Sequence, residues 1–152
     1  MSKSDTSARI KVAYVLADDD VIEPRLSVAD WADLKRGFEL FHAHKFWDSH
    51  EAWELVWRRH KQPSRIFFQG LIQTAAACHQ IEQGVYHGAV KHCNNALLKI
   101  RQFPDGFLGV GVLGLVHAIE VCRDMVERLG KNGLGDFDTD WFPVIDFAQP
   151  SE

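Results

Sequence analysis

The chain has 152 residues, of which 46% are hydrophobic and 25% charged, a balance that predicts one globular domain with a sizeable core. Its formal net charge of -4 lacks the basic excess on which binding to phosphate backbones depends, so we expect no nucleic-acid partner. The odd set of Cys78, Cys93 and Cys122 has no CxxC spacing, which favours free core thiols in a reducing cytoplasm over a disulfide framework or a zinc ribbon.

Two segments bear on membrane insertion. The polar, Ser-rich start of the chain lacks the apolar region of a signal peptide. The longest apolar stretch, residues 107–116, is interrupted by glycine and is much shorter than the roughly 20 residues that span a bilayer. We therefore expect a cytoplasmic protein that does not enter the membrane.

The first helix is predicted after an irregular lead-in of residues 1–24. Ser27 followed by Asp30 is typical of a helix N-cap, and apolar residues then recur at helical spacing to about residue 43. A second helix is expected over about 46–60, before Pro63.

Three more helices are predicted after Pro63. The segment at about 64–83 is apolar nearly all round and should be the central, most buried helix. Helices over about 86–102 and 112–129 follow, the last ending at Gly130. Residues 25–130 are therefore predicted to form a single all-α domain, an up-and-down bundle of about five helices, with residues 131–152 as a docked or flexible tail.

Polar and aromatic residues are interleaved in the second predicted helix, in the run HEAWELVW at residues 50–57. His50 and Glu54 are four residues apart, so their Cβ atoms lie about 5–6 Å apart on one face. Trp53 and Trp57 fall on the same stripe, which has the spacing of a core-facing surface. Because unpartnered burial of a polar group costs about 1–3 kcal/mol, we expect something to satisfy His50 and Glu54.

The third predicted helix supplies a second polar pair, Gln69 and Gln73. If this helix packs across the second one, the two glutamines meet His50 and Glu54, either in a hydrogen-bond network or around a small polar pocket. His79 lies about 80° around the helix from Gln69, so it joins this cluster only at its edge.

Two interpretations of the pair remain open. Imidazole and carboxylate are ordinary ligands of divalent metals, but two ligands are too few, and a third would have to come from Glu51, Gln69, Gln73, His79 or elsewhere. The run is not the HExxH of zinc proteases, because Glu54 replaces the second histidine. The other interpretation is a charge-assisted structural pair closed off by the glutamines and the Trp57 indole N–H.

The motif His50-x-x-x-Glu54-x-x-Trp57 resembles the HxxxExxW motif of the family called domain of unknown function 309, a group of all-helical bacterial and archaeal proteins. The resemblance covers about residues 36–129 and includes the run FFQGLIQ at 67–73 and His79. It implies an up-and-down helical bundle and a motif suggested to bind metal, with no established reaction.

Two hypotheses follow for function. In the first, the site binds a divalent metal or a small polar ligand, with His50 as ligand or base and Glu54 as ligand or orienting group. Phe46, Trp53 and Trp57 then wall the pocket, and Gln69 and Gln73 position the bound molecule. In the second, the chain is a non-catalytic interaction or scaffolding module, whose aromatic residues feed a homo-oligomer interface and whose polar cluster fixes helix register.

Overall fold

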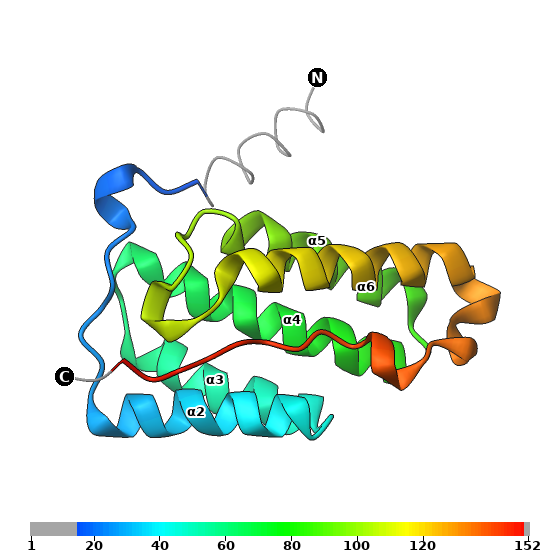
Figure 1. The fold of residues 1–152 in the computed structure, drawn as a ribbon, viewed down its shortest axis with the longest axis horizontal. Helices are drawn as coiled ribbons and strands as arrows, with labels where there is room; N and C mark the ends of the chain where they lie inside the picture. The colour runs from blue at the N-terminus through cyan, green and yellow to red at the C-terminus, as the bar shows by residue number, and fades with distance from the viewer. Residues whose placement is uncertain (1–14, 151–152) are drawn as a thin grey trace.

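The computed structural model describes residues 15–150. Within them the chain forms five α-helices, α2 (Val28–His42), α3 (Phe46–Arg59), α4 (Ile66–Glu82), α5 (Tyr86–Ile100) and α6 (Val112–Gly133). Short 3-10 turns are η1 (Asp18–Asp20), η2 (Pro63–Arg65), η3 (Phe107–Gly109), η4 (Leu134–Asp136) and η5 (Thr139–Trp141). The predicted all-α bundle is confirmed (Figure 1).

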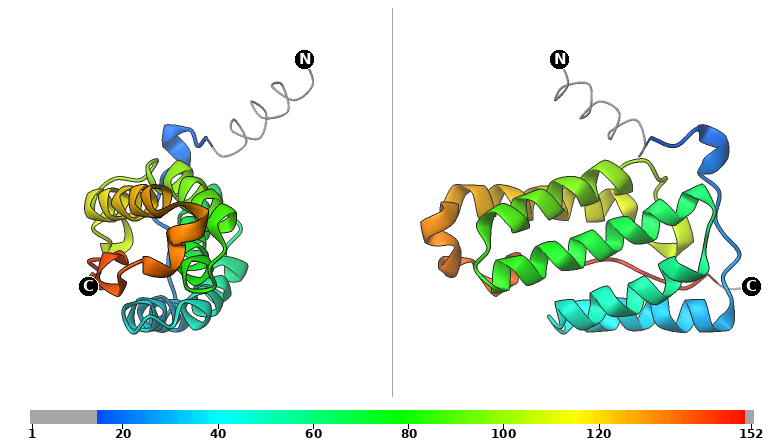
Figure 2. Two further views of the ribbon diagram at one scale, coloured as in Figure 1. Left: turned by 90° about the vertical axis from the view of Figure 1, so that its right-hand side faces the viewer. Right: turned by 180° about the vertical axis from the view of Figure 1, so that it is seen from behind.

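Helix α4 lies at the centre of the helical arrangement. Helices α3 and α5 both pack on it, while α2 packs on α3 and α6 on α5 (Figure 2). Ten of the 17 residues of α4 are buried, as expected for a helix that is apolar nearly all round. None of the helices between residues 15 and 150 combines the length and apolarity that crossing a bilayer requires.

The three cysteines lie inside the bundle, one each on α4, α5 and α6. Cys78, Cys93 and Cys122 are all free and buried, so the prediction of core thiols is confirmed. Burial raises the pKa of the Cys78 thiol, which keeps it protonated and unreactive.

The N-terminus of α2 is fixed by the predicted cap and by a contact across the bundle. Ser27 Oγ accepts from the Asp30 N–H at 3.0 Å, and Asp30 Oδ2 accepts from the Ser27 N–H at 3.1 Å. Asp30 also accepts from Arg59 Nη1 at 2.9 Å, and its Oδ2 lies 2.9 Å from Nε2 of the buried His60. The first turn of α2 is therefore tied to the end of α3 by a buried carboxylate.

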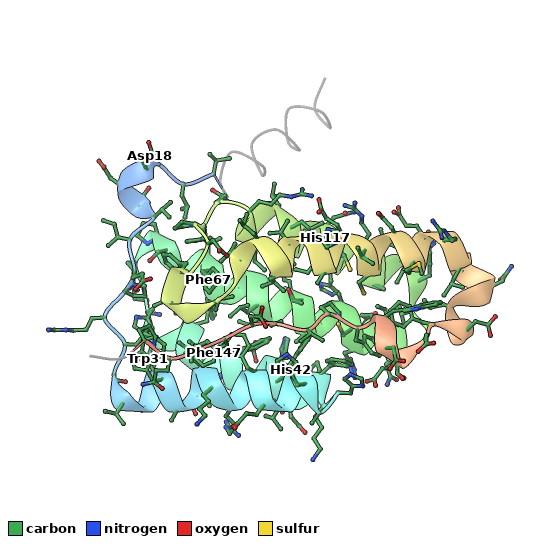
Figure 3. All side chains as sticks on the ribbon, in the orientation of Figure 1. Asp18, Trp31, His42, Phe67, His117 and Phe147 are labelled. Carbon is green, nitrogen blue, oxygen red and sulfur yellow. The ribbon has the colours of Figure 1, made fainter. Side chains whose placement is uncertain are left out.

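The C-terminal tail runs back along α2 after α6 (Figure 1). The helical backbone breaks at Gly130, where φ is +70°, and α6 resumes to Gly133. The Ile145 N–H donates to His42 Nε2 at 2.9 Å, and Phe147 stacks on Phe38 with ring centroids 4.5 Å apart. Figure 3 shows Trp31, Phe147 and His42 in a row along this edge. These contacts hold the tail against α2 as far as Phe147.

The N-terminal lead-in is described only from residue 15. Residues 15–27 contain no α-helix, and the single 3-10 turn η1 covers Asp18–Asp20. Glu23 Oε2 accepts from the Leu108 N–H at 2.8 Å, which ties this segment to the loop before α6. The prediction for residues 1–14 lies outside the described part of the chain.

Asp30→Asn is expected to lower the free energy of unfolding by about 2–3 kcal/mol, because it removes a charged acceptor from Arg59 and His60. Burial by itself would raise the pKa of Asp30, but the hydrogen bonds from Arg59, Ser27 and His60 lower it overall. The stabilisation should therefore be present at neutral pH and disappear as the pH falls below about 4.

Urea unfolding of both forms at pH 7 and in acid measures this difference. Asp33→Asn is the matched control, because Asp33 binds the same arginine at a more exposed position and should cost about 1 kcal/mol or less. Equal losses for the two variants would contradict the prediction.

His42 should make the docking of the tail sensitive to pH, because Nε2 can accept from Ile145 only while it is unprotonated. The pKa of His42 is lowered from 6.5, mainly by burial and also by the charge of His44, whereas Asp146 opposes this change. The stabilisation is therefore present above pH 6.5 and is lost as the pH falls through the lowered pKa.

Glutamine can accept the same hydrogen bond without titrating. Between pH 7.5 and pH 5 the free energy of unfolding should therefore fall by about 0.5–1 kcal/mol less in His42→Gln than in the unsubstituted protein. Urea unfolding at the two pH values measures it. His117→Gln on the exposed face of α6 is the control, and an equal pH dependence in all three proteins would refute the role of His42.

Candidate binding site on α3, α4 and α5

His50 and Glu54 lie one above the other on α3, as their spacing predicts. His50 Nδ1 and Glu54 Oε1 are 3.7 Å apart, which is too long for a hydrogen bond. Their side chains are 17% and 31% exposed, and Glu54 also lies 3.8 Å from Arg58 Nη2. The pair is therefore loosely associated at the edge of the core, and His50 Nδ1 is buried with no hydrogen-bond partner among the described residues.

Trp47 provides the aromatic wall of His50. The two rings stack with centroids 4.9 Å apart and an interplanar angle of 10°. The Trp47 ring centroid also lies 5.3 Å from that of His79, which brings His79 of α4 beside the ring that covers His50. Trp47 is 52% exposed, and the sequence-based expectation missed it, although its spacing of three residues from His50 indicates that the two side chains can meet.

Trp53 and Phe46 belong to the core and do not wall the pair, in contrast to the sequence-based expectation. Trp53 is fully buried against α2, where its Nε1 donates to the Leu34 carbonyl at 3.1 Å and its ring fits against Gly37. Phe46 is 1% exposed and packs on Phe41. The physical reason is that α3 packs on both α2 and α4, so the aromatic residues on its wide apolar face pack against different neighbours.

Trp57 remains on the same face of α3 as His50 and Glu54. The guanidinium carbon of Arg65 lies 4.4 Å from the centre of its ring. Its Nε1 is buried and has no hydrogen-bond partner among residues 15–150. An indole N–H can only donate, so this group has an unused capacity for an acceptor.

Gln69 and Gln73 lie on the one stripe of α4 that the neighbouring helices leave partly open. Residues 69, 73, 76 and 80 recur at helical spacing and are all half-buried. Within the described residues, neither glutamine is hydrogen-bonded to His50 or Glu54. Gln73 Oε1 instead accepts from Lys99 Nζ on α5 at 2.9 Å. Lys99 is only 1% exposed and burial lowers its pKa, yet no motif in the sequence had pointed to it.

His92 brings a further imidazole to this region from α5. Its Nδ1 is buried and has no hydrogen-bond partner in the described part of the chain. Burial lowers the pKa of His92, and the charges of Lys91, His50 and Lys99 lower it further. Burial also lowers the pKa of His50, against the opposing effect of Glu54. The two imidazoles therefore lie within reach of each other's charge although they come from different helices.

We call the polar residues of this face the polar seam. It consists of His50, Glu54 and Trp57 on α3, Gln69, Gln73 and His79 on α4, and His92 and Lys99 on α5. Its members come from three consecutive helices that pack side by side in the order α3, α4, α5. Among residues 15–150, no three His, Cys, Asp or Glu side chains are grouped so that they could hold a metal ion.

A separate groove of about 430 Å³ borders Glu54 on its other side. It is lined by Arg36, Leu40, Asp48, Glu51, Glu54, Leu55 and Arg58. Charged side chains of both signs line it, and His50 does not. This groove could hold a small molecule, but its lining includes neither the imidazoles nor the buried nitrogens of the neighbouring polar residues.

The fold and the seam define a small all-α protein with a half-buried polar face across three helices. Residues 34–92 match the model of the family described as "Domain of unknown function (DUF309)". The resemblance inferred from the sequence is thereby confirmed over this segment, which runs from α2 into α5 and includes every member of the polar seam except Lys99. No curated protein and no solved structure matches the chain.

Gly37→Ala should destabilise the protein by about 1–3 kcal/mol, because the added Cβ would overlap the indole ring of Trp53. Urea unfolding measures the loss. Gly114→Ala on α6 is the matched control, because its Cβ would meet nothing and the change should stabilise the helix by about 0.5–1 kcal/mol. A neutral Gly37→Ala would show that Trp53 is not held against α2.

Proposed function

We propose that the polar seam binds a small polar molecule and that His50 exchanges a proton with it. The observation that carries the proposal is the set of buried nitrogens without a hydrogen-bond partner in the described residues, Nδ1 of His50, Nδ1 of His92 and Nε1 of Trp57. Buried polar atoms in folded proteins are nearly always hydrogen-bonded, so three such nitrogens associated with one face favour a binding site.

The surroundings of His50 suit acid–base chemistry. Because burial lowers its pKa below 6.5, the imidazole is neutral at pH 7 and able to accept a proton. Glu54, 3.7 Å away, favours the imidazolium that forms through its charge. Trp47 covers one face of the ring and limits the approach of water from that side. In this proposal Glu54 acts on His50 through its negative charge and does not react.

A small polar molecule accounts for the seam better than the divalent metal that the motif also suggested. The imidazoles and the carboxylate do not form a group of three that could coordinate an ion within residues 15–150. The free, buried cysteines favour a cytoplasmic location for this activity.

The second candidate is a non-catalytic interaction module in which the polar cluster fixes helix register. One observation favours it, the hydrogen bond between Gln73 and the buried Lys99, which joins α4 to α5. The exposed Trp47 would then serve a homo-oligomer interface. The two candidates differ in what the removal of His50 does to stability and to ligand binding.

His50→Ala is expected to lower the free energy of unfolding by no more than about 1 kcal/mol, because Nδ1 makes no hydrogen bond within residues 15–150 and the Glu54 contact is partly exposed. It should also abolish binding of any compound that stabilises the unsubstituted protein. The measurement is thermal unfolding against a panel of sugars, amino acids, carboxylates, phosphates and divalent metal ions.

His87→Ala is the matched control, an exposed histidine at the start of α5, and should bind like the unsubstituted protein. A loss of about 2–5 kcal/mol in His50→Ala, with no compound from the panel bound by the unsubstituted protein, would favour the structural module. Binding that survives in His50→Ala would place the site elsewhere.

A further inference from the structure

We propose that the molecule bound in the polar seam carries an anionic oxygen group, a carboxylate or a phosphate, which is held by the imidazoles of His50 and His92. This inference rests on the proposed function and names the class of its ligand. It goes beyond the motif, because His92 lies on a different helix, 42 positions after His50.

The hydrogen-bonding character of the seam favours an acceptor. The three buried atoms of the seam that have no hydrogen-bond partner among residues 15–150 are nitrogens, and the indole N–H of Trp57 can only donate. Each imidazole can present an N–H at Nδ1, and both nitrogens of a ring donate once it is protonated. Ionised carboxylates and phosphates accept hydrogen bonds and bind such donors more strongly than neutral groups do.

The charges around the two imidazoles also favour an anion. The charges that lower the pKa of His92 belong to Lys91 and Lys99 on its own helix and to His50 on α3, which are all cationic or able to become so. His50 faces His79 from α4 and the carboxylates Glu51 and Glu54 from its own helix. Glu54 is offset by Arg58, 3.8 Å away. The charges that act on His92 are therefore cationic, whereas those that act on His50 include two carboxylates.

Proton coupling separates an anion from a metal ion. In the free protein, burial favours the neutral form of His50 and of His92. A bound anion stabilises the protonated imidazoles, so their pKa values rise and binding takes up protons. A metal ion requires neutral imidazoles, so its binding lowers their pKa values and releases protons. The direction of the pKa change thus identifies the class of ligand.

The test is an NMR titration of the imidazole protons of the full chain, alone and with saturating inorganic phosphate, acetate or Zn²⁺. We expect phosphate, acetate or both to raise the pKa of His50 and His92 by about one unit each, equivalent to about tenfold tighter binding by the protonated ring. The two anions distinguish a phosphate ligand from a carboxylate ligand. His87, exposed on the same helix as His92, should not shift and is the internal reference.

The variant His92→Gln keeps a donor but cannot titrate, so it should bind the anion with less proton uptake and weaker affinity at pH 6. His87→Gln is its matched control and should bind like the unsubstituted protein. If Zn²⁺ lowers the pKa of His50 or His92 and neither anion changes it, the proposal is overturned in favour of a metal ion.

Failure of this inference is distinguishable from failure of the proposed function. Binding of a neutral compound from the panel that depends on His50, with no response to phosphate or acetate, would refute the anion and leave a polar-ligand site. The absence of any binding, together with a large loss of stability in His50→Ala, would refute both.

Discussion

The burial of α4 between α3 and α5 is the constraint on which the rest of the molecule depends. Because α4 is apolar nearly all round, its neighbours cover most of its surface and leave a single half-buried stripe at residues 69, 73, 76 and 80. Polar side chains from α3 and α5 that flank this stripe are partly removed from water whether or not they find partners. The seam is therefore a consequence of how the core is packed, and its unused nitrogens are held in place by that packing.

Two histidine–carboxylate arrangements in the protein differ in a way that bears on function. His60 and Asp30 are buried and 2.9 Å apart, and Gln62 and Arg59 complete their hydrogen bonds. His50 and Glu54 are 3.7 Å apart, and Nδ1 of His50 lacks a partner in the described residues. The first arrangement has the geometry of a structural clamp. The second has capacity left for a bound molecule, so the contrast within one chain favours a binding role for His50.

Three histidines whose pKa is lowered by burial lie at the docked tail and in the polar seam. His42 accepts the backbone of the docked tail, while His50 and His92 lie in the seam, and burial lowers the pKa of all three. Acidification therefore acts on the tail and on the seam in opposite senses. It weakens a contact that needs an unprotonated acceptor, whereas it strengthens binding of an anion to donors.

The sequence by itself determined the five helices, the Ser27–Asp30 cap, the buried character of α4, and the juxtaposition of His50 and Glu54, because each depends on spacing within one helix. It also gave enough of the motif to indicate the family. Only the tertiary structure decided that Trp53 fills the space beside Gly37, that Trp47 covers His50, and that His92 and Lys99 join the seam. Periodicity defines which residues share a helix face, but which neighbour covers that face depends on how three helices pack together, and no local spacing records it.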